Sequence, residues 1–128
     1  MRPPARTGVL IYAKNLGTMS AFYEHVLGAR VVHADAEHAV LQSPDVQIIL
    51  HAIPPQYAES IEISTPPVAR EQQAIKPFFT VDSLSDAELR VEARGGLVWG
   101  PLWPAPGLRV RNVCDPEGNI IHLRERIG

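Results

Sequence analysis

Apolar and polar residues follow one another along the first half of the chain in a pattern that predicts one helix among four strands. Residues 9–13 form a short β-rich run, and residues 18–27 carry apolar side chains at offsets of three and four, as on one face of a helix. Asn15 or Thr18 can cap the start of this helix, and Gly28 can end it in the left-handed conformation that favours glycine. Three further strand-like runs follow, at residues 30–34, 38–42 and 46–51.

The second half of the chain repeats this order. A strand is predicted at residues 78–81, and a helix with a capping-box start follows it. Further strands are predicted at residues 97–99, 108–114 and 120–124. Asn15 precedes Gly28 by the same interval as Asp82 precedes Gly95, which indicates two β-α-β-β-β repeats. One such unit buries too little surface by itself, so we expect the two to pack together.

The chain length fits one domain, which we expect to span residues 1–128. Repeat one covers about residues 8–52, and repeat two covers about residues 75–125. The connection at 53–74 is rich in proline and contains Ser60–Ser64, which could add an edge strand.

Composition and charge narrow the class of protein. The apolar fraction of 45% is ordinary for a globular chain, and the formal net charge of −2 argues against a nucleic-acid binder. No apolar run is long enough to cross a bilayer, so we expect no membrane partner. A single cysteine, Cys114, excludes an internal disulfide and favours the cytoplasm. We interpret Cys114 as a core residue.

Two motifs resemble those of the vicinal-oxygen-chelate superfamily, which includes glyoxalases, bleomycin resistance proteins and extradiol dioxygenases. The segment Phe22-Tyr23-Glu24-His25-Val26-Leu27-Gly28 resembles the first-helix signature of that family, and residues 115–123 (DPEGNIIHL) resemble its closing hairpin. The resemblance covers roughly residues 8–125. It implies an α+β fold in which two β-α-β-β-β repeats form a cupped mixed sheet. It also implies a homodimer, and a small-molecule ligand held in the cup.

The resemblance further implies where metal ligands would lie. The positions that usually supply histidine and glutamate fall on Gly8, Lys76, Ile49 and His122, or on His51 in place of Ile49 if the register shifts. Glycine has no donor, and a charged lysine has no free lone pair. A stable transition-metal site needs about three protein ligands. We therefore predict no cofactor and no metal ligand.

Alternation along the strands predicts which side chains line the cup. His122 and His51 are the candidate catalytic residues, because an imidazole titrates near neutral pH. The candidate ligand-binding residues are Tyr12, Gln47, Ile49, Lys76, Phe78, Trp99, Trp103, Arg109 and Arg111.

These candidates carry different chemistry. Lys76 could hold a carboxylate or an enolate as a point charge, and Arg109 with Arg111 could recognise a carboxylate as a fork pair. Trp99 and Trp103 flank a proline-rich loop and could cover a ligand or close one end of the barrel. Each charged or histidine candidate could instead be a structural or solvated residue. The remaining histidines, His25, His33 and His38, receive no role.

Three functions follow from these residues. The first is a metal-free protein of the bleomycin-resistance kind that binds a small aromatic or anionic molecule. The second is a metal-dependent lyase, isomerase or dioxygenase, with donors supplied by His51, Glu62 or a second chain. The third is a metal-independent enzyme in which His122 or His51 moves a proton on a substrate held by Lys76 or an arginine. We favour the first, and the sequence leaves open whether the protein is an enzyme.

Overall fold

The computed structural model describes residues 3–128, which divide into two compact units. Unit 1 ends at Glu62, and unit 2 runs from Ile63 to Gly128. Each predicted repeat lies within one unit. Whether the two units work as a single domain stays a prediction.

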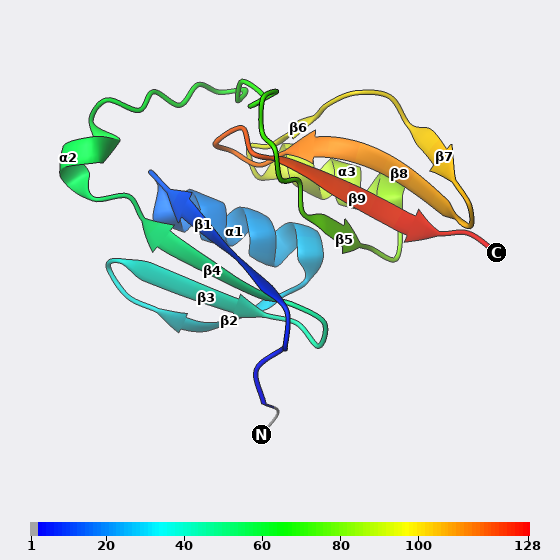
Figure 1. Cartoon of the computed structure of the whole chain (residues 1–128), viewed down its shortest axis with the longest axis horizontal. Coiled ribbons are helices and arrows are strands. Elements are labelled where there is room, and N and C mark those ends of the chain that lie inside the picture. The colour runs from blue at the N-terminus through cyan, green and yellow to red at the C-terminus, as the bar shows by residue number, and fades with distance from the viewer. Residues whose placement is uncertain (1–2) are drawn as a thin grey trace. The chain divides into compact units, whose positions relative to one another are not determined.

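Unit 1 is a four-stranded mixed sheet with one helix against it (Figure 1). Its elements are β1 (Gly8–Ala13), α1 (Leu16–Leu27), β2 (Arg30–Ala34), β3 (His38–Gln42) and β4 (Gln47–Ala52). The strand order is β1-β4-β3-β2, in which β1 runs parallel to β4 and the other neighbours are antiparallel. A short helix, α2 (Pro55–Ala58), follows the sheet.

The ends of α1 form as the sequence predicts. The Asn15 side chain accepts a hydrogen bond from the Thr18 N–H at 3.0 Å, so Asn15 is the cap rather than Thr18. Gly28 ends the helix with φ of 67°. One face of α1 buries Met19, Phe22, Tyr23 and Val26. The sheet face that contacts α1 buries Ala39, Leu41, Ile48 and Leu50.

Unit 2 repeats the same order of strands around one helix. Its elements are β5 (Phe78–Thr80), α3 (Leu84–Ala93), β6 (Leu97–Val98), β7 (Trp103–Ala105), β8 (Leu108–Cys114) and β9 (Ile120–Arg126). The order is β5-β9-β8-β6, with β5 parallel to β9 and β7 also paired to β8. The strands β5, β9, β8 and β6 therefore correspond to β1, β4, β3 and β2. The predicted α+β fold of two β-α-β-β-β repeats is confirmed.

Two local predictions were wrong. Trp103 does not lie in a loop but begins β7, and Pro104 is tolerated there because β7 pairs only with β8. Residues 60–64 form no strand, because their backbone groups bond elsewhere: the Ile61 N–H donates to Ala58 O, and Lys14 Nζ donates to Ile61 O.

The β8–β9 turn is built around Asp115, which is fully buried. Its Oδ1 accepts the backbone N–H groups of Glu117 and Asn119 at 2.9 and 3.1 Å, and its Oδ2 accepts Asn119 Nδ2 at 2.8 Å. The aspartate and the asparagine of the DPEGN motif therefore hold the turn closed.

Residues 68–73, which we call the strap, lie across this turn. The Arg70 N–H donates to Gly118 O at 2.9 Å, and the Gln73 side chain bonds both the N–H and the carbonyl of Ile120 at 2.9 and 2.7 Å. Gly118 has φ of +88°, and a Cβ there would lie 2.2 Å from Val68 O. Only glycine fits where the strap meets the turn.

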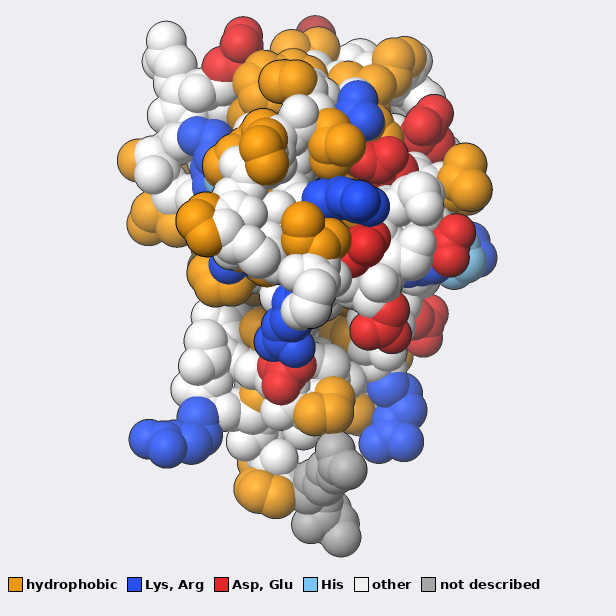
Figure 2. All heavy atoms as spheres, turned by 90° about the vertical axis from the view of Figure 1, so that its right-hand side faces the viewer, with side chains coloured by type: hydrophobic (Ala, Val, Ile, Leu, Met, Phe, Trp, Pro, Cys, Tyr) orange, Lys and Arg blue, Asp and Glu red, His pale blue; other side chains and the backbone are white. Residues whose placement is uncertain are grey.

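No helix among residues 3–128 is long and apolar enough to cross a membrane. Figure 2 shows one face of the molecule, on which Lys and Arg side chains are interspersed with Asp, Glu and apolar side chains. No charge of a single sign dominates that face.

Candidate functional site

Each sheet has a face away from its helix, which we call the open face. In unit 1 the helix-side positions of β4 are Ile48 and Leu50, both fully buried, so Gln47, Ile49 and His51 project from the open face. In β9 the helix-side positions are Ile121 and Leu123, also fully buried. The open face of unit 2 therefore carries Ile120, His122 and Arg124.

His122 lies at the centre of the open face of unit 2. It stands opposite Phe78 in the parallel ladder and opposite Asn112 in the antiparallel one. The Trp103 ring meets the imidazole edge to face, with the ring centroids 5.8 Å apart. Next along β9, the Arg124 guanidinium carbon lies 4.0 Å from the centroid of the Phe78 ring, a cation–π contact.

Trp99 joins the same surface. Trp99 directly follows the last residue of β6, and its backbone N–H donates to Asn112 O at 3.0 Å. The β6–β8 register, carried one residue further, sets Trp99 opposite Asn112 and on the open face. Both tryptophans predicted to contact a ligand therefore lie on the same face as His122.

The surroundings of His122 favour its neutral imidazole. Burial lowers the pKa of His122, and the positive charges of Arg124 and Lys76 lower it further. Lys76 is positioned by a hydrogen bond from its ammonium group to Gln73 O at 3.1 Å. At neutral pH the ring therefore offers one N–H and one lone pair.

Two polar atoms on this face are buried without a hydrogen-bond partner among the described residues. They are Asn112 Oδ1, an acceptor, and Arg124 Nε, a donor. Buried polar groups are normally paired, so each such exception needs an explanation. Both lie on the face that carries His122, where a bound molecule could satisfy them.

Arg109 and Arg111 were predicted to bind the ligand together with His122, but the structure places them on the opposite face of the sheet from His122. They do share a face, but the ladder pairs them with Glu125 and Leu123, which lie on the α3 side of the sheet. Arg111 Nη1 lies 3.6 Å from Glu88 Oε2 of α3, and Arg109 Nη1 lies 3.9 Å from Glu125 Oε2. Carboxylates on the helix side hold both arginines there.

The open face of unit 1 is different in chemistry. Tyr12 and Leu10 project from it with more than half of their surface exposed. Gln47 donates to Gln42 Oε1 at 3.1 Å, and Ile49 lies between Leu10 and Val40 in the ladder. The row formed by Leu10, Ile49 and Val40 is therefore apolar.

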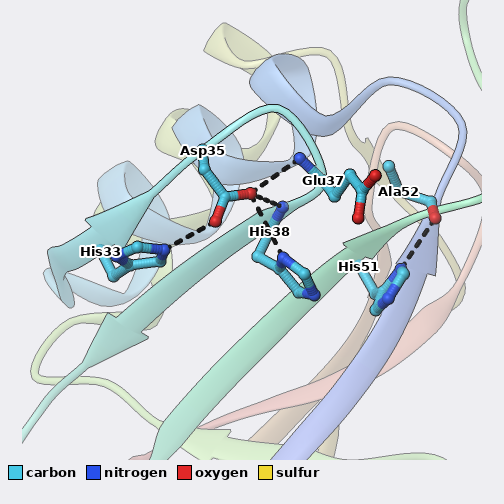
Figure 3. A network of polar contacts seen from close by, with 6 residues as sticks. All are labelled: His33, Asp35, Glu37, His38, His51 and Ala52. Atoms are coloured by element: carbon cyan, nitrogen blue, oxygen red, sulfur yellow. Dashed lines mark hydrogen bonds and ion pairs between the residues drawn. The ribbon is translucent and has the colours of Figure 1, made fainter.

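His51 belongs to a histidine cluster that the sequence analysis missed (Figure 3). The His51 ring lies 4.5 Å from that of His38 and 5.0 Å from that of Tyr12, between ring centroids. His38 in turn bonds Asp35, which also bonds His33 at 2.8 Å. The signal was present in the sequence: a tight turn at 43–46 fixes the β3–β4 register, and that register sets His38 opposite His51.

Asp35 is the anionic centre of this cluster. Its carboxylate accepts the His33 ring N–H and the backbone N–H groups of Glu37 and His38, each at 2.8 Å. The His33 bond contributes most to holding the pKa of Asp35 well below its usual value. The carboxylate is therefore ionised at neutral pH.

Cys114 is fully buried on β8. Burial raises the pKa of its thiol to about 11, so it is protonated at neutral pH and is a core residue, as the sequence indicates.

The comparisons with known proteins agree with this architecture. A family model described as the Glyoxalase/Bleomycin resistance protein/Dioxygenase superfamily matches residues 7–123. The chain belongs to this superfamily. The resemblance seen in the two sequence motifs is thereby confirmed.

Several solved structures match over nearly the whole chain. A glyoxalase/bleomycin resistance protein/dioxygenase family enzyme from Burkholderia phytofirmans PsJN is 19% identical, with TM-score 0.72, covering 96% of this chain and 99% of the other. The fosfomycin resistance protein FosX from Mesorhizobium loti is 17% identical, with TM-score 0.67, covering 99% and 95%. An integron cassette protein from V. cholerae is 25% identical, with TM-score 0.62, covering 98% and 97%. No curated protein matches the chain.

The metal ligands implied by the superfamily resemblance do not fit the residues present here. At the first-strand position of unit 1, a Cβ on Gly8 would lie 2.6 Å from Gln47 O, so no ligating side chain has room. At the equivalent position of unit 2, Lys76 donates to Gln73 O. Among residues 3–128 no group of three or more His, Cys, Asp and Glu side chains is placed to hold a metal ion. We therefore derive no chemistry from a metal at these positions.

Proposed function

We propose that this superfamily member binds a small anionic molecule with a planar or aromatic part on the open face of unit 2. The observation that carries the proposal is Arg124, whose guanidinium lies over Phe78 while its buried Nε has no hydrogen-bond partner within residues 3–128. The ligand would bind without a metal at the superfamily positions. The predicted homodimer and cytoplasmic location stay predictions.

The positive charge on this face favours an anion. Arg124 and Lys76 both act on His122, so two cations converge on the same surface. A guanidinium binds a carboxylate or phosphate through two parallel hydrogen bonds, and its stacking on Phe78 restricts its orientation. An acidic ligand group could accept from Arg124 Nε and so satisfy that atom.

The aromatic side chains favour a planar ligand. Phe78 is 58% exposed and Trp103 is 38% exposed, although side chains of this size are usually buried. Small-molecule sites combine such apolar surfaces with a few directed polar groups. Asn112 Oδ1 is a directed acceptor here and would select a ligand that carries a hydrogen-bond donor.

A second function is favoured by one specific observation, the lowered pKa of His122. A neutral imidazole can accept a proton, and Lys76 and Arg124 would stabilise the negative charge that forms on the substrate. In this alternative the protein is a metal-independent acid–base enzyme that abstracts a proton next to a carboxylate or carbonyl group.

Binding can be tested by calorimetry with benzoate-type carboxylates and the neutral amides of the same shape, in the presence of EDTA. We expect the carboxylates to bind about tenfold more tightly than the amides, because one charged hydrogen-bonded contact contributes about 1.4 kcal/mol or more. Arg124→Gln should remove this preference, and Phe78→Ala should weaken both ligand classes.

Arg109→Gln is the matched control, because Arg109 carries the same charge on the helix side of the same sheet. Equal losses in Arg109→Gln and Arg124→Gln would mean that net charge alone attracts the ligand, and the proposed site would be abandoned. Arylacetates carry α-protons, which benzoates lack, so exchange of the α-protons of a bound arylacetate in D₂O separates the two functions. If the protein catalyses exchange, and His122→Asn abolishes the exchange but still binds the ligand, the protein is an enzyme. If the ligand binds and no exchange occurs, the result supports a binding protein.

A further inference from the structure

The structure carries a second constellation that the proposed function does not use, on the open face of unit 1. His38 of β3 and His51 of β4 stand directly opposite each other in the antiparallel ladder. Their rings meet edge to face with the centroids 4.5 Å apart. Two imidazoles from adjacent strands are thereby held on one surface by the sheet backbone (Figure 3).

The hydrogen bonds at Nδ1 fix which nitrogen of each ring is free. His51 Nδ1 lies 2.8 Å from Ala52 O, and a carbonyl oxygen can only accept, so Nδ1 carries the proton. His38 Nδ1 lies 3.2 Å from Asp35 Oδ1, an ionised carboxylate that also only accepts. In both rings Nε2 therefore carries the lone pair, the atom through which an imidazole can bind a metal ion.

This arrangement is the one that metal-binding histidines adopt. A ligating imidazole usually donates its second N–H to a carboxylate or a backbone carbonyl, which orients the ring and raises its basicity. His38 bonds the carboxylate and His51 bonds the carbonyl. We propose that His38 and His51 form a two-histidine binding site for a divalent transition-metal ion of the Cu²⁺, Ni²⁺ or Zn²⁺ class.

The local charge supports a cation. The Asp35 carboxylate is held in place by the backbone N–H groups of Glu37 and His38, both at 2.8 Å, so it places a fixed negative charge behind the His38 ring. The nearest cationic position on β2, Arg30, lies opposite Gln42 at the other end of the β2–β3 ladder. Residues 31–42 therefore contribute no lysine or arginine to the cluster, and Lys14, which follows β1 at the His51 end, donates to Ile61 O.

The donor set also indicates which ions bind and how tightly. Imidazole selects Cu²⁺, Ni²⁺ and Zn²⁺ over Mg²⁺ and Ca²⁺, and affinity rises toward Cu²⁺. Among the described residues no third His, Cys, Asp or Glu completes the coordination, so water or another molecule fills the remaining positions. The site thus holds an exchangeable ion. It lies on different residues from the anion site of unit 2 and does not depend on that proposal.

The test is titration of the full, untagged chain with Cu²⁺ by calorimetry, with electron paramagnetic resonance to count the coordinating nitrogens. We expect His38→Gln and His51→Gln each to weaken binding at least about tenfold and to reduce the signal from two imidazoles to one. The double variant should lose the imidazole signal altogether and bind Cu²⁺ more weakly than either single variant, because each ring supplies one coordinating nitrogen. Asp35→Asn keeps the oxygen that accepts the backbone N–H groups but loses the charge, and should weaken binding about tenfold.

His25→Gln and His122→Gln are the controls, because both remove a histidine outside the cluster. Unchanged Cu²⁺ affinity in the controls, with loss in the cluster variants, supports the site. Cu²⁺ affinity that survives in both His38→Gln and His51→Gln, or that falls in a control instead, overturns it. Thermal unfolding of each variant shows whether a loss of binding reflects a loss of fold.

Discussion

The two units build the same sheet but place different chemistry on it. In unit 1 the ladder row of Ile49 is apolar, with Leu10 on one side and Val40 on the other. In unit 2 the equivalent row holds His122 between Phe78 and Asn112. The strand order and the buried helix-side positions of β4 and β9 are the same, so the difference resides in the open-face side chains.

The next row also differs between the units. In unit 1 it holds His51 with His38 and Tyr12, the row of the proposed metal site. In unit 2 the equivalent row holds Arg124 with Thr80 and Val110, the row of the proposed anion site. The two proposals thus assign ligands of opposite charge to one repeated scaffold, and the scaffold alone does not decide the function.

The largest expected effect tests whether the two scaffolds are equivalent. Leu50 and Leu123 are fully buried at matching positions of β4 and β9, so Leu50→Ala and Leu123→Ala should each lower the free energy of unfolding by about 4 kcal/mol. Leu10→Ala, on the open face and 52% exposed, should change it by only about 0.5 kcal/mol. Urea unfolding measures all three. A large loss at only one of the two buried leucines would show that the units are not equivalent.

A smaller effect tests a feature described only for unit 2, the strap across the β8–β9 turn. Gly118→Ala introduces a left-handed alanine and a contact of 2.2 Å with Val68 O, and should cost about 3 kcal/mol. Gly107→Ala is the control, because Gly107 also has positive φ but a Cβ there meets nothing within 4 Å. It should cost about 1 kcal/mol. Similar losses of unfolding free energy in the two variants would mean that the strap moves aside at little cost and does not stabilise the turn.

The smallest effect concerns the charge environment of His122. Its pKa, followed by NMR, should lie below the ordinary value of 6.5, and Arg124→Gln should raise it because one of the two cations is removed. The unfolded chain binds the His122 proton at higher pH than the folded one. The stability from this group is therefore present above pH 6.5 and is lost as the pH falls through the folded pKa.

The His122→Gln variant should lose this part of the pH dependence of unfolding, whereas His25→Gln should keep it. A His122 pKa at or above 6.5 would contradict the cationic description of the unit 2 face and, with it, the contrast between the two units.

Much of the fold could be predicted from the sequence, because the sequence patterns that mark helix ends and buried strand positions are local. The Asn15 cap, the Gly28 stop and the buried pairs in β4 and β9 each depend on residues close together in the chain. The repeat then supplied the architecture. The β7 strand escaped prediction because Trp103-Pro104-Ala105 gives a turn-like signal, and its pairing with β8 is a tertiary effect.

The candidate site was only partly predictable. Strand alternation correctly placed His122 and Phe78 on the open face. For Arg109 and Arg111, alternation shows only that the two side chains share a face, and it does not show which face α3 covers. That information comes from the pairing of β8 with β9 and from the carboxylate of Glu88 on α3. His33, Asp35 and His38 were missed because each looks exposed when considered alone. Their significance appears only when the β3–β4 register brings His38 to His51.

The parallel pairing of the first and last strands in each unit sets an order of events while the chain is being synthesised. β2, β3 and β4 are joined by short turns and can pair as soon as they emerge, whereas β1 has to wait until β4 is available. All four strands find their partners before Glu62. Since synthesis proceeds from the N-terminus at roughly 5–20 residues per second, the histidine pair of unit 1 can assemble seconds before β9 brings His122 to Phe78.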